Sequence, residues 1–303
     1  MQHQLKVTVA KMITDLPKYE IKAEAMEQYL APSGHLQSSD VPAMAIPKKW
    51  KFEKENKAEK EEEGEEAKKE KKSLFFGTLL HTLSIEPNNY EKEYGLARKF
   101  DGRKNEDKAA LAEWLQINKG KKPVEPTVYA NSQTALKNVL AHKAFQTLRS
   151  AATPELSHYI KSKELGVPCK FRPDLLNVEA GYMVSVKTTK SPETDGWPKE
   201  VINFNYHIKE AFYQILLNEC YGGKITEFYW FVIGNCAPFD CGLYQMPEEL
   251  LSIGREWVRY YAATYKECLE TGNWWGLEKF ATEQGILPFE IPTWIKQVPL
   301  INL

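Results

Sequence analysis

The stretch from Cys169 to Thr189 constrains the fold of this 303-residue chain more than any other. Its first part carries Asp174, and Gly181 then marks a turn. The apolar run Tyr182 to Val186 follows and ends at Lys187. Two short runs joined by a glycine-containing turn predict a β-hairpin. Such a hairpin would bring the acid and the lysine to one edge of a sheet.

An aspartate beside a lysine, with room for a divalent cation, is a minimal set of groups for cleaving a phosphodiester bond. The metal would neutralise the phosphate and activate water. The lysine would orient that water or stabilise developing negative charge. The hairpin therefore predicts a hydrolytic site built on Asp174 and Lys187.

Composition is compatible with a large core in one large domain or two small ones. The chain is 43% hydrophobic and contains 8 Trp, 15 Tyr and 13 Phe. No apolar run reaches 18 residues and no N-terminal signal is present, so we expect a cytoplasmic protein without a membrane partner. The odd number of cysteines, 5, without a Cys-x-x-Cys pair, suits a reducing compartment. The net charge of -1 does not exclude a local channel for nucleic acid.

Hydrophobic periodicity predicts an α/β fold with a mixed central sheet flanked by helices. The expected helices are Ser73–Ile85, Lys104–Asn118, Ser132–Ser150, Tyr206–Cys220 and Pro247–Leu269. The expected strands outside the hairpin are Glu155–Ile160, Phe228–Ile233 and Cys241–Met246. A Pro/Gly-containing loop is expected over Ser191–Pro198, and an irregular wrap after Gly272.

Three regions follow from the composition. Residues 1–47 form a weakly patterned N-terminal segment, and residues 48–72 consist almost entirely of Lys and Glu. The main domain would occupy residues 73–303. The charged run is typical of a solvated insertion, either disordered or a single exposed helix. An alternative is an arm that recruits a partner.

Five motifs in order carry a family likeness. They are Gly77-Thr-Leu-Leu-His81, Glu155-Leu-Ser, Cys169-Lys-Phe-Arg-Pro-Asp174, Val186-Lys-Thr-Thr189 and Tyr206-His-Ile-Lys-Glu-Ala-Phe-Tyr213. The chain resembles the nuclease domain of exodeoxyribonuclease VIII (RecE), of the PD-(D/E)xK superfamily, from about Ser73 to about Lys296. The likeness includes Ile291-Pro-Thr-Trp-Ile-Lys near the end.

This resemblance implies a restriction-endonuclease-like core and metal-dependent digestion of linear duplex DNA from its ends. It makes His81 and Asp174 ligands of Mg²⁺ or Mn²⁺, with the backbone carbonyl of Val186 beside them. Lys187 would be the catalytic lysine. Glu155 falls where the family has an acid before the hairpin and would help to hold a second metal.

The resemblance also implies partners of the phage recombination type. These are duplex DNA ends, a single-strand annealing protein and further copies of the chain in a ring-like homo-oligomer. The DNA backbone would be gripped by basic residues bordering the site, which are Lys170, Arg172, Lys190, Lys199 and Lys209.

The chain departs from the family pattern at two positions. The third carboxylate of the signature, two residues before Lys187, is Ser185 here. A neutral hydroxyl is a weak Mg²⁺ ligand, so metal binding should suffer. A glutamine expected on the following helix is Lys209, a cation that opposes metal binding but could contact a phosphate.

Three interpretations of Ser185 stay open at this point. The acid has migrated to Glu210 or Glu155; or the protein binds DNA ends or a partner without cutting; or the serine is an engineered substitution. If the likeness misled, Asp174 would be a turn residue and His81 a core histidine. Nuclease and non-catalytic binding module thus remain the rival functions.

Overall fold

The structure, a computed structural model, describes residues 18–56 and 65–289. Its centre is a five-stranded sheet in the order β10-β9-β8-β7-β4. Strands β8 and β9 are parallel, whereas the other neighbouring pairs are antiparallel. The strands are β4 (Thr153–Pro154), β7 (Leu175–Asn177), β8 (Tyr182–Thr189), β9 (Glu227–Gly234) and β10 (Cys241–Gln245). The sheet is therefore mixed, which confirms the fold predicted from the sequence.

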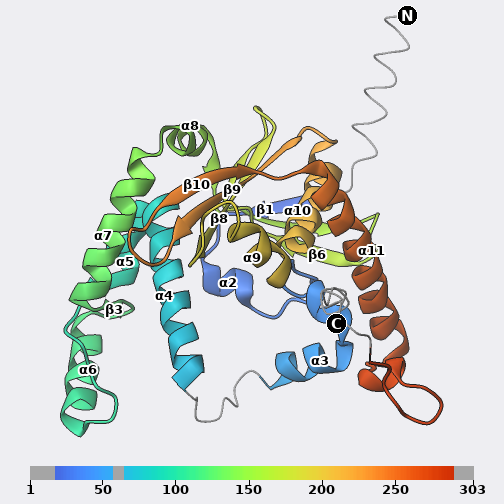
Figure 1. Cartoon of the computed structure of the whole chain (residues 1–303), viewed down its shortest axis with the longest axis horizontal. Coiled ribbons are helices and arrows are strands. Elements are labelled where there is room, and N and C mark those ends of the chain that lie inside the picture. The colour runs from blue at the N-terminus through green and yellow to red at the C-terminus, as the bar shows by residue number, and fades with distance from the viewer. Residues whose placement is uncertain (1–17, 57–64, 290–303) are drawn as a thin grey trace, which may run out of the picture.

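Helices cover both faces of this sheet (Figure 1). Helices α4 (Glu65–Ile85), α7 (Pro126–Ala141) and α8 (Lys143–Ala151) share one apolar cluster with Val184 and Val186. Helices α9 (Trp197–Asn203), α10 (Tyr206–Tyr221) and α11 (Glu248–Thr271) share the other with Met183. Since side chains alternate along a strand, Ser185 and Lys187 lie on the α10 side of β8.

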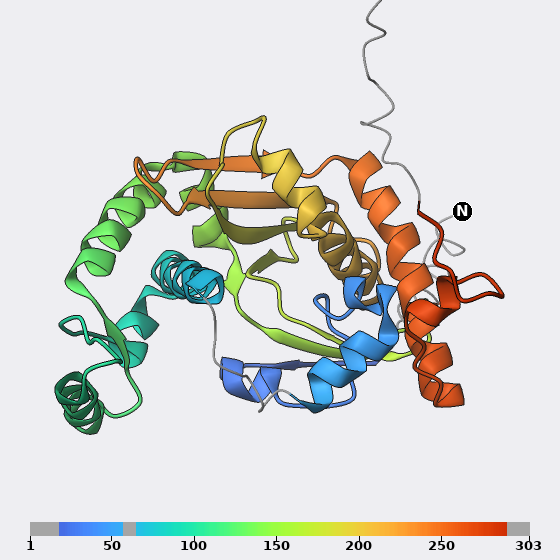
Figure 2. The same cartoon turned by 60° about the horizontal axis from the view of Figure 1, so that its bottom comes forward.

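A second, antiparallel sheet joins distant parts of the chain (Figure 2). Its order is β1-β5-β6, with β1 at Tyr19–Lys22, β5 at Ser157–Lys161 and β6 at Pro168–Phe171. The predicted hairpin is consequently shorter than expected. Strand β6 pairs with β5, and the antiparallel partner of β8 is the short strand β7, which begins immediately after Asp174.

Two other expectations need correction. The single helix predicted over Ser132–Ser150 is two helices, because His142 ends α7 and also caps α8 by accepting the Phe145 N–H at 3.2 Å. Part of the loop predicted at Ser191–Pro198 already belongs to α9. That helix begins at Trp197 and has proline in its first turn, where a missing N–H costs nothing.

The described ends of the Lys/Glu run are helical. Helix α3 (Pro47–Glu55) packs through Trp50, which stacks on Trp274 at 5.3 Å and donates to Asp40 at 3.0 Å. The other end enters α4; the middle of the run and the motif after Ile291 lie outside the described residues. The remaining elements are α2 (Met26–Leu30), η1 (Pro42–Ala45), α5 (Pro87–Glu93), β2 (Tyr94–Leu96), α6 (Asn105–Ile117), β3 (Lys122–Val124) and η2 (Leu277–Phe280).

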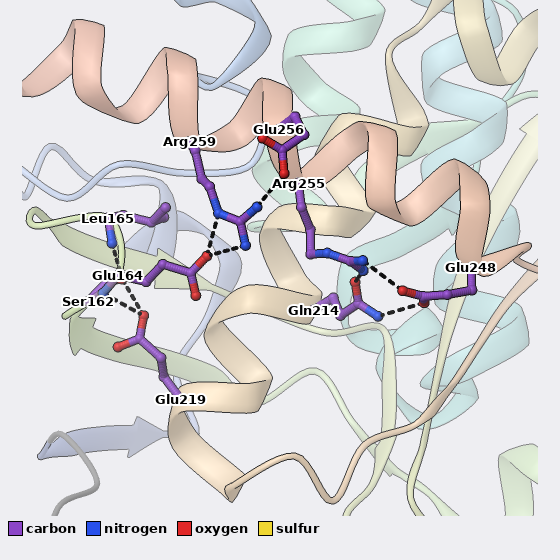
Figure 3. A network of polar contacts seen from close by, with 9 residues as sticks. All are labelled: Ser162, Glu164, Leu165, Gln214, Glu219, Glu248, Arg255, Glu256 and Arg259. Atoms are coloured by element: carbon purple, nitrogen blue, oxygen red, sulfur yellow. Dashed lines mark hydrogen bonds and ion pairs between the residues drawn. The ribbon is translucent and has the colours of Figure 1, made fainter.

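Polar contacts fasten α11 to its neighbours (Figure 3). Arg255 donates to Gln214 of α10 at 2.5 Å and to Glu248 at 2.7 Å. Arg259 donates to Glu164, in the turn between β5 and β6, at 2.9 Å. These contacts connect the β1-β5-β6 sheet to the helices that cover one face of the five-stranded sheet. In the described ranges, no helix is both long and apolar enough to cross a membrane.

Candidate active site

Three side chains from separate elements converge at the start of β7. His81 Nε2 lies 3.4 Å from Glu155 Oε1 and 3.4 Å from Asp174 Oδ1. All three ligand atoms lie within 4.8 Å of one another. His81 comes from α4, Glu155 from the connection between β4 and β5, and Asp174 from the residue before β7. The residues that the resemblance made metal ligands therefore form one cluster.

Backbone contacts fix Asp174 in place. The Val186 N–H donates to Asp174 Oδ2 at 2.6 Å, and the Asp174 carbonyl accepts the Glu155 N–H at 3.3 Å. In a strand, the N–H and C=O of one residue point to the same side. The Val186 carbonyl therefore faces the side on which Asp174 lies, as the predicted metal site requires.

A glycine lets α4 bring His81 close to the sheet. A Cβ on Gly77 would lie 2.6 Å from Thr188 Oγ1 of β8, which is shorter than real contacts allow. Gly77 precedes His81 by about one helical turn, so both occupy the same face of α4. The Gly77-to-His81 spacing in the sequence thus reflects a close helix-to-strand approach.

Glu155 is held in an uncommon conformation. Its φ is +55°, in the left-handed region that non-glycine residues rarely adopt. Arg172 Nε donates to Glu155 Oε2 at 2.5 Å. The other oxygen, Oε1, is buried and faces His81 and Asp174, and among the described residues it has no hydrogen-bond partner. A buried polar atom normally has a partner, so an ion is a natural occupant of this position.

The charges of the cluster shift all three titrations. Burial and the Asp174 charge raise the pKa of Glu155 to about 7, against the opposing effects of His81 and Arg172. Burial also opposes ionisation of Asp174, but the charges of His81 and Lys187 outweigh it and lower its pKa. For His81, burial opposes the charged form, yet Asp174 and Glu155 outweigh it and raise the pKa. Protons and a metal ion would therefore compete for this site.

The donor set fits a divalent cation. Two carboxylates and a backbone carbonyl are oxygen donors of the kind that Mg²⁺ and Mn²⁺ prefer, and imidazole is a common ligand of transition metals. The orphaned Glu155 Oε1 and the clustering of the ligand atoms give this fit a structural basis.

The carboxylate nearest to Ser185 comes from α10. Ser185 Oγ donates to Glu210 Oε2 at 2.8 Å, and Lys187 Nζ lies 3.1 Å from Glu210 Oε1. Burial opposes the charge of Lys187, but Glu210 and Asp174 outweigh it and raise the pKa of the ammonium. Lys187 is therefore protonated. Among the described residues, the compact metal-ligand cluster does not include Glu210.

Comparison with known proteins assigns the chain to a family. Residues 47–277 match the family described as "PDDEXK-like domain of unknown function (DUF3799)". The chain belongs to this PDDEXK-like family. The match spans more than half of the sequence, and it confirms the resemblance to the PD-(D/E)xK superfamily.

The fold of this PDDEXK-like protein is similar to a solved structure. A crystal structure of a "putative exonuclease" from Eubacterium rectale gives a TM-score of 0.56 at 12% sequence identity. The similarity covers 92% of this chain and 100% of the other. At this identity the likeness concerns the fold alone. No functionally curated protein matches the sequence.

Two of the predicted DNA-binding residues in this PDDEXK-like domain are buried. Lys170 is 1% exposed, and its ammonium donates to the carbonyls of Tyr29 and Ala31. Arg172 is 9% exposed and is paired with Glu155. The prediction that these two cations contact DNA is wrong, because both charges are turned into the protein. Burial of these two cations could not be predicted, since positive charge alone does not reveal burial.

The other predicted DNA contacts remain accessible. Lys190 and Lys199 are exposed, and Lys209 is half-buried. Lys209 Nζ lies 5.2 Å from the Tyr206 ring centroid, and Lys187 Nζ lies 5.5 Å from it. Burial and the neighbouring Lys187 charge lower the pKa of Lys209. Two ammonium groups thus gather around Tyr206 beside Glu210, which favours the approach of an anion.

Proposed function

We propose that this protein is a divalent-metal-dependent nuclease that degrades duplex DNA from its ends. One observation carries the proposal: ligand atoms of His81, Glu155 and Asp174 lie within 4.8 Å of one another, and the charge of Lys187 acts on Asp174. Membership of a PDDEXK-like family and the exonuclease-like fold support nuclease chemistry. The preference for duplex ends rests on the RecE-like order of the motifs.

The side chains divide the chemistry between them. A bound Mg²⁺ or Mn²⁺ would supply Lewis-acid polarisation of a phosphate oxygen and activation of water. Asp174, His81, Glu155 and the Val186 carbonyl would hold it. Because Lys187 is protonated, it acts as a hydrogen-bond donor that orients water and stabilises developing negative charge, and it does not take up the proton.

Glu210 accounts for the missing third carboxylate. Its hydrogen bond from Ser185 and its ion pair with Lys187 place negative charge beside the position where the signature acid would stand. Glu155 supplies a second carboxylate to the metal cluster itself. The contacts therefore support the migrated-acid interpretation of Ser185, with Glu155 at the metal and Glu210 at the lysine.

Exposed cations would bind the DNA backbone. Lys209 would contact the phosphate nearest to Lys187, and Lys190, which follows β8, would contact a phosphate farther along the strand. Such contacts position the substrate without reading its sequence, and they make affinity dependent on salt. DNA without sequence preference is the expected substrate.

The test compares two forms of one plasmid. The purified full chain is incubated with linear or covalently closed circular DNA and Mg²⁺ or Mn²⁺, and acid-soluble nucleotides are measured. We expect release from the linear form only. Lys187→Ala should reduce the rate by about 100-fold or more, since it removes a transition-state donor. The control Lys266→Ala changes an exposed lysine of α11 and should be neutral. End binding without nucleotide release would overturn the proposal.

A further inference from the structure

A buried set of hydrogen bonds joins Arg172 to Glu155 and to its surroundings. Arg172 Nε donates to Glu155 Oε2 at 2.5 Å, and its Nη1 donates to Ser157 Oγ at 3.1 Å. Nη1 also donates to the Glu24 carbonyl at 2.8 Å, and the Arg172 carbonyl accepts the Tyr213 hydroxyl at 3.1 Å. The guanidinium is thus anchored from several sides within a buried setting.

These contacts determine which oxygen of Glu155 is available. Arg172 occupies Oε2, so Oε1 faces His81 and Asp174. The backbone of Glu155 has a positive φ and lies between strands, so no regular element constrains its side chain. A planar guanidinium fixes the direction of a carboxylate better than an ammonium does, because its donors form a rigid fork.

We propose that Arg172 is a positioning residue of the metal site, anchored in turn by the Glu24 carbonyl of the N-terminal segment. The proposal rests on the function proposed above, since it assumes that Glu155 binds the metal. Glu24 precedes the family match, which begins at residue 47. The segment before the matched domain therefore contributes to the metal site through Arg172.

Lys170 provides a matched control. Its ammonium donates to the Tyr29 and Ala31 carbonyls, so it fastens the same N-terminal segment to β6. The contact of Arg172 with Glu155 is separate from these two hydrogen bonds. A variant at Lys170 should therefore loosen the segment and leave the metal ligands in place.

The experiment measures Mn²⁺ binding to the full chain by isothermal titration calorimetry. The variants are Arg172→Gln, Arg172→Lys, Ser157→Ala and Lys170→Met, each checked for folding by circular dichroism and by thermal denaturation in EDTA. Arg172→Gln should raise the Kd for Mn²⁺ by about 10-fold or more, as expected for loss of a residue that orients a ligand. Arg172→Lys should recover only part of the affinity. Lys170→Met loosens the segment that carries the Glu24 carbonyl but leaves Arg172 paired with Glu155, so it should lose much less affinity than Arg172→Gln does.

Ser157→Ala keeps the pair between Arg172 and Glu155 but removes one anchor of the guanidinium. It should raise the Kd by a smaller factor, about fivefold. If Arg172→Gln does not fold, this milder variant decides the question, and an unchanged Kd overturns the positioning role.

The other outcomes are also decisive. Wild-type Kd in folded Arg172→Gln, or full affinity in Arg172→Lys, would overturn the orienting role of Arg172 and leave the proposed nuclease standing. If Lys170→Met loses as much Mn²⁺ affinity as Arg172→Gln, general loosening of the N-terminal segment explains both losses, and the specific role of Arg172 is overturned. A wild-type chain that binds no Mn²⁺ would overturn the proposed metal site itself, and this inference with it.

Discussion

Glu210 contacts Ser185 and Lys187 at the same time, and the two contacts make different demands on its carboxylate. The side chain is 1% exposed, so its charge is stable only while a partner compensates it. Lys187 supplies that compensation at 3.1 Å, whereas the Ser185 hydroxyl contributes direction and no charge. The charge contact between Glu210 and Lys187 should therefore matter more for activity than the hydrogen bond from Ser185.

Substitution at these positions tests that difference. Glu210→Gln removes the negative charge that contacts the Lys187 ammonium and, together with Asp174, raises its pKa, and we expect kcat to fall by about 100-fold or more. Ser185→Ala removes one hydrogen bond of roughly 1 kcal/mol and should reduce kcat by no more than about tenfold. Steady-state kinetics on linear duplex DNA measure both. Equal losses in the two variants would contradict the separate roles.

Metal affinity should increase with pH. The pKa of Glu155 is raised to about 7 by burial and by Asp174, and that of His81 is also raised. Below pH 7 Glu155 increasingly holds a proton that a metal must displace, and the raised pKa of His81 acts in the same direction. The Kd for Mn²⁺ should fall from pH 6 to pH 8. Calorimetry in two buffers of different ionisation enthalpy should detect proton release at pH 6.5, and an affinity independent of pH would contradict the assignment.

The roles of some residues of the site could be predicted from the sequence, and those of others could not. Asp174, Lys187 and His81 stand at ordered, family-like spacings, so their convergence was expected. Arg172 and Lys170 were misassigned, because burial is set by the N-terminal segment that packs over β6 and not by neighbours in sequence. The contact between Ser185 and Glu210 depends on how α10 packs against β8, which the sequence alone does not show.

At the scale of elements, the approach of α4 to β8 positions His81. Gly77 and Thr188 are the closest points of this contact. Alanine would favour the helix by roughly 1 kcal/mol over glycine in isolation. Here its Cβ would collide with Thr188 Oγ1 and push the helix away from the sheet.

Gly77→Ala should therefore weaken Mn²⁺ binding by about tenfold, because His81 moves with the helix. The double variant Gly77→Ala/Thr188→Ala removes the colliding oxygen and should recover most of the lost affinity. Titration calorimetry on the two variants and on Thr188→Ala measures this coupling. If the double variant is no better than Gly77→Ala, the close contact does not position His81.

The elements themselves were predictable where periodicity is strong, as in α6, α10 and α11. The break at His142 was not, because neither glycine nor proline marks it and the capping contact depends on the histidine ring. Strand β6 was assigned to the wrong partner because the short run before Asp174 has no feature that distinguishes one sheet from another. That choice is made by β5 and the distant β1.

On the scale of the whole molecule, His158 links the second sheet to the helical layer. It is 1% exposed on β5, its Nε2 is 2.8 Å from the Tyr221 hydroxyl of α10, and its ring stacks on Phe171 at 4.6 Å. Burial lowers the pKa of His158 to about 4, although its contact with the Leu156 carbonyl opposes the shift. The folded protein therefore contains neutral His158 in a range where the unfolded chain would be protonated.

Stability should decrease as the pH falls from about 6.5 to about 4, the window between the two pKa values of this histidine. Between pH 7 and pH 5 the loss from His158 should be about 2 kcal/mol in the free energy of unfolding. Urea denaturation of the wild type and of His158→Gln at both pH values isolates this contribution. The variant should lose less stability than the wild type over the same interval, and an identical loss would contradict the neutral state.

The mixed sheet and its two helical layers follow from the alternation of strand and helix patterns along the chain. The second sheet does not, because β1 pairs with β5 across more than 130 residues, as in the register of Tyr19 with Ile160. Pairing over such a distance leaves no local trace in the sequence. For the same reason the hydrogen bond from Arg172 to the Glu24 carbonyl could not be predicted from the sequence.

In the proposed metal site, His81, Glu155 and Asp174 hold a divalent cation next to Lys187. An anomalous difference map from crystals of the full chain grown with Mn²⁺, collected above and below the manganese absorption edge, tests it most directly. We predict a single strong peak in contact with His81 Nε2, Glu155 Oε1 and Asp174 Oδ1. A map with manganese elsewhere, or with none at these three atoms, would contradict the claim.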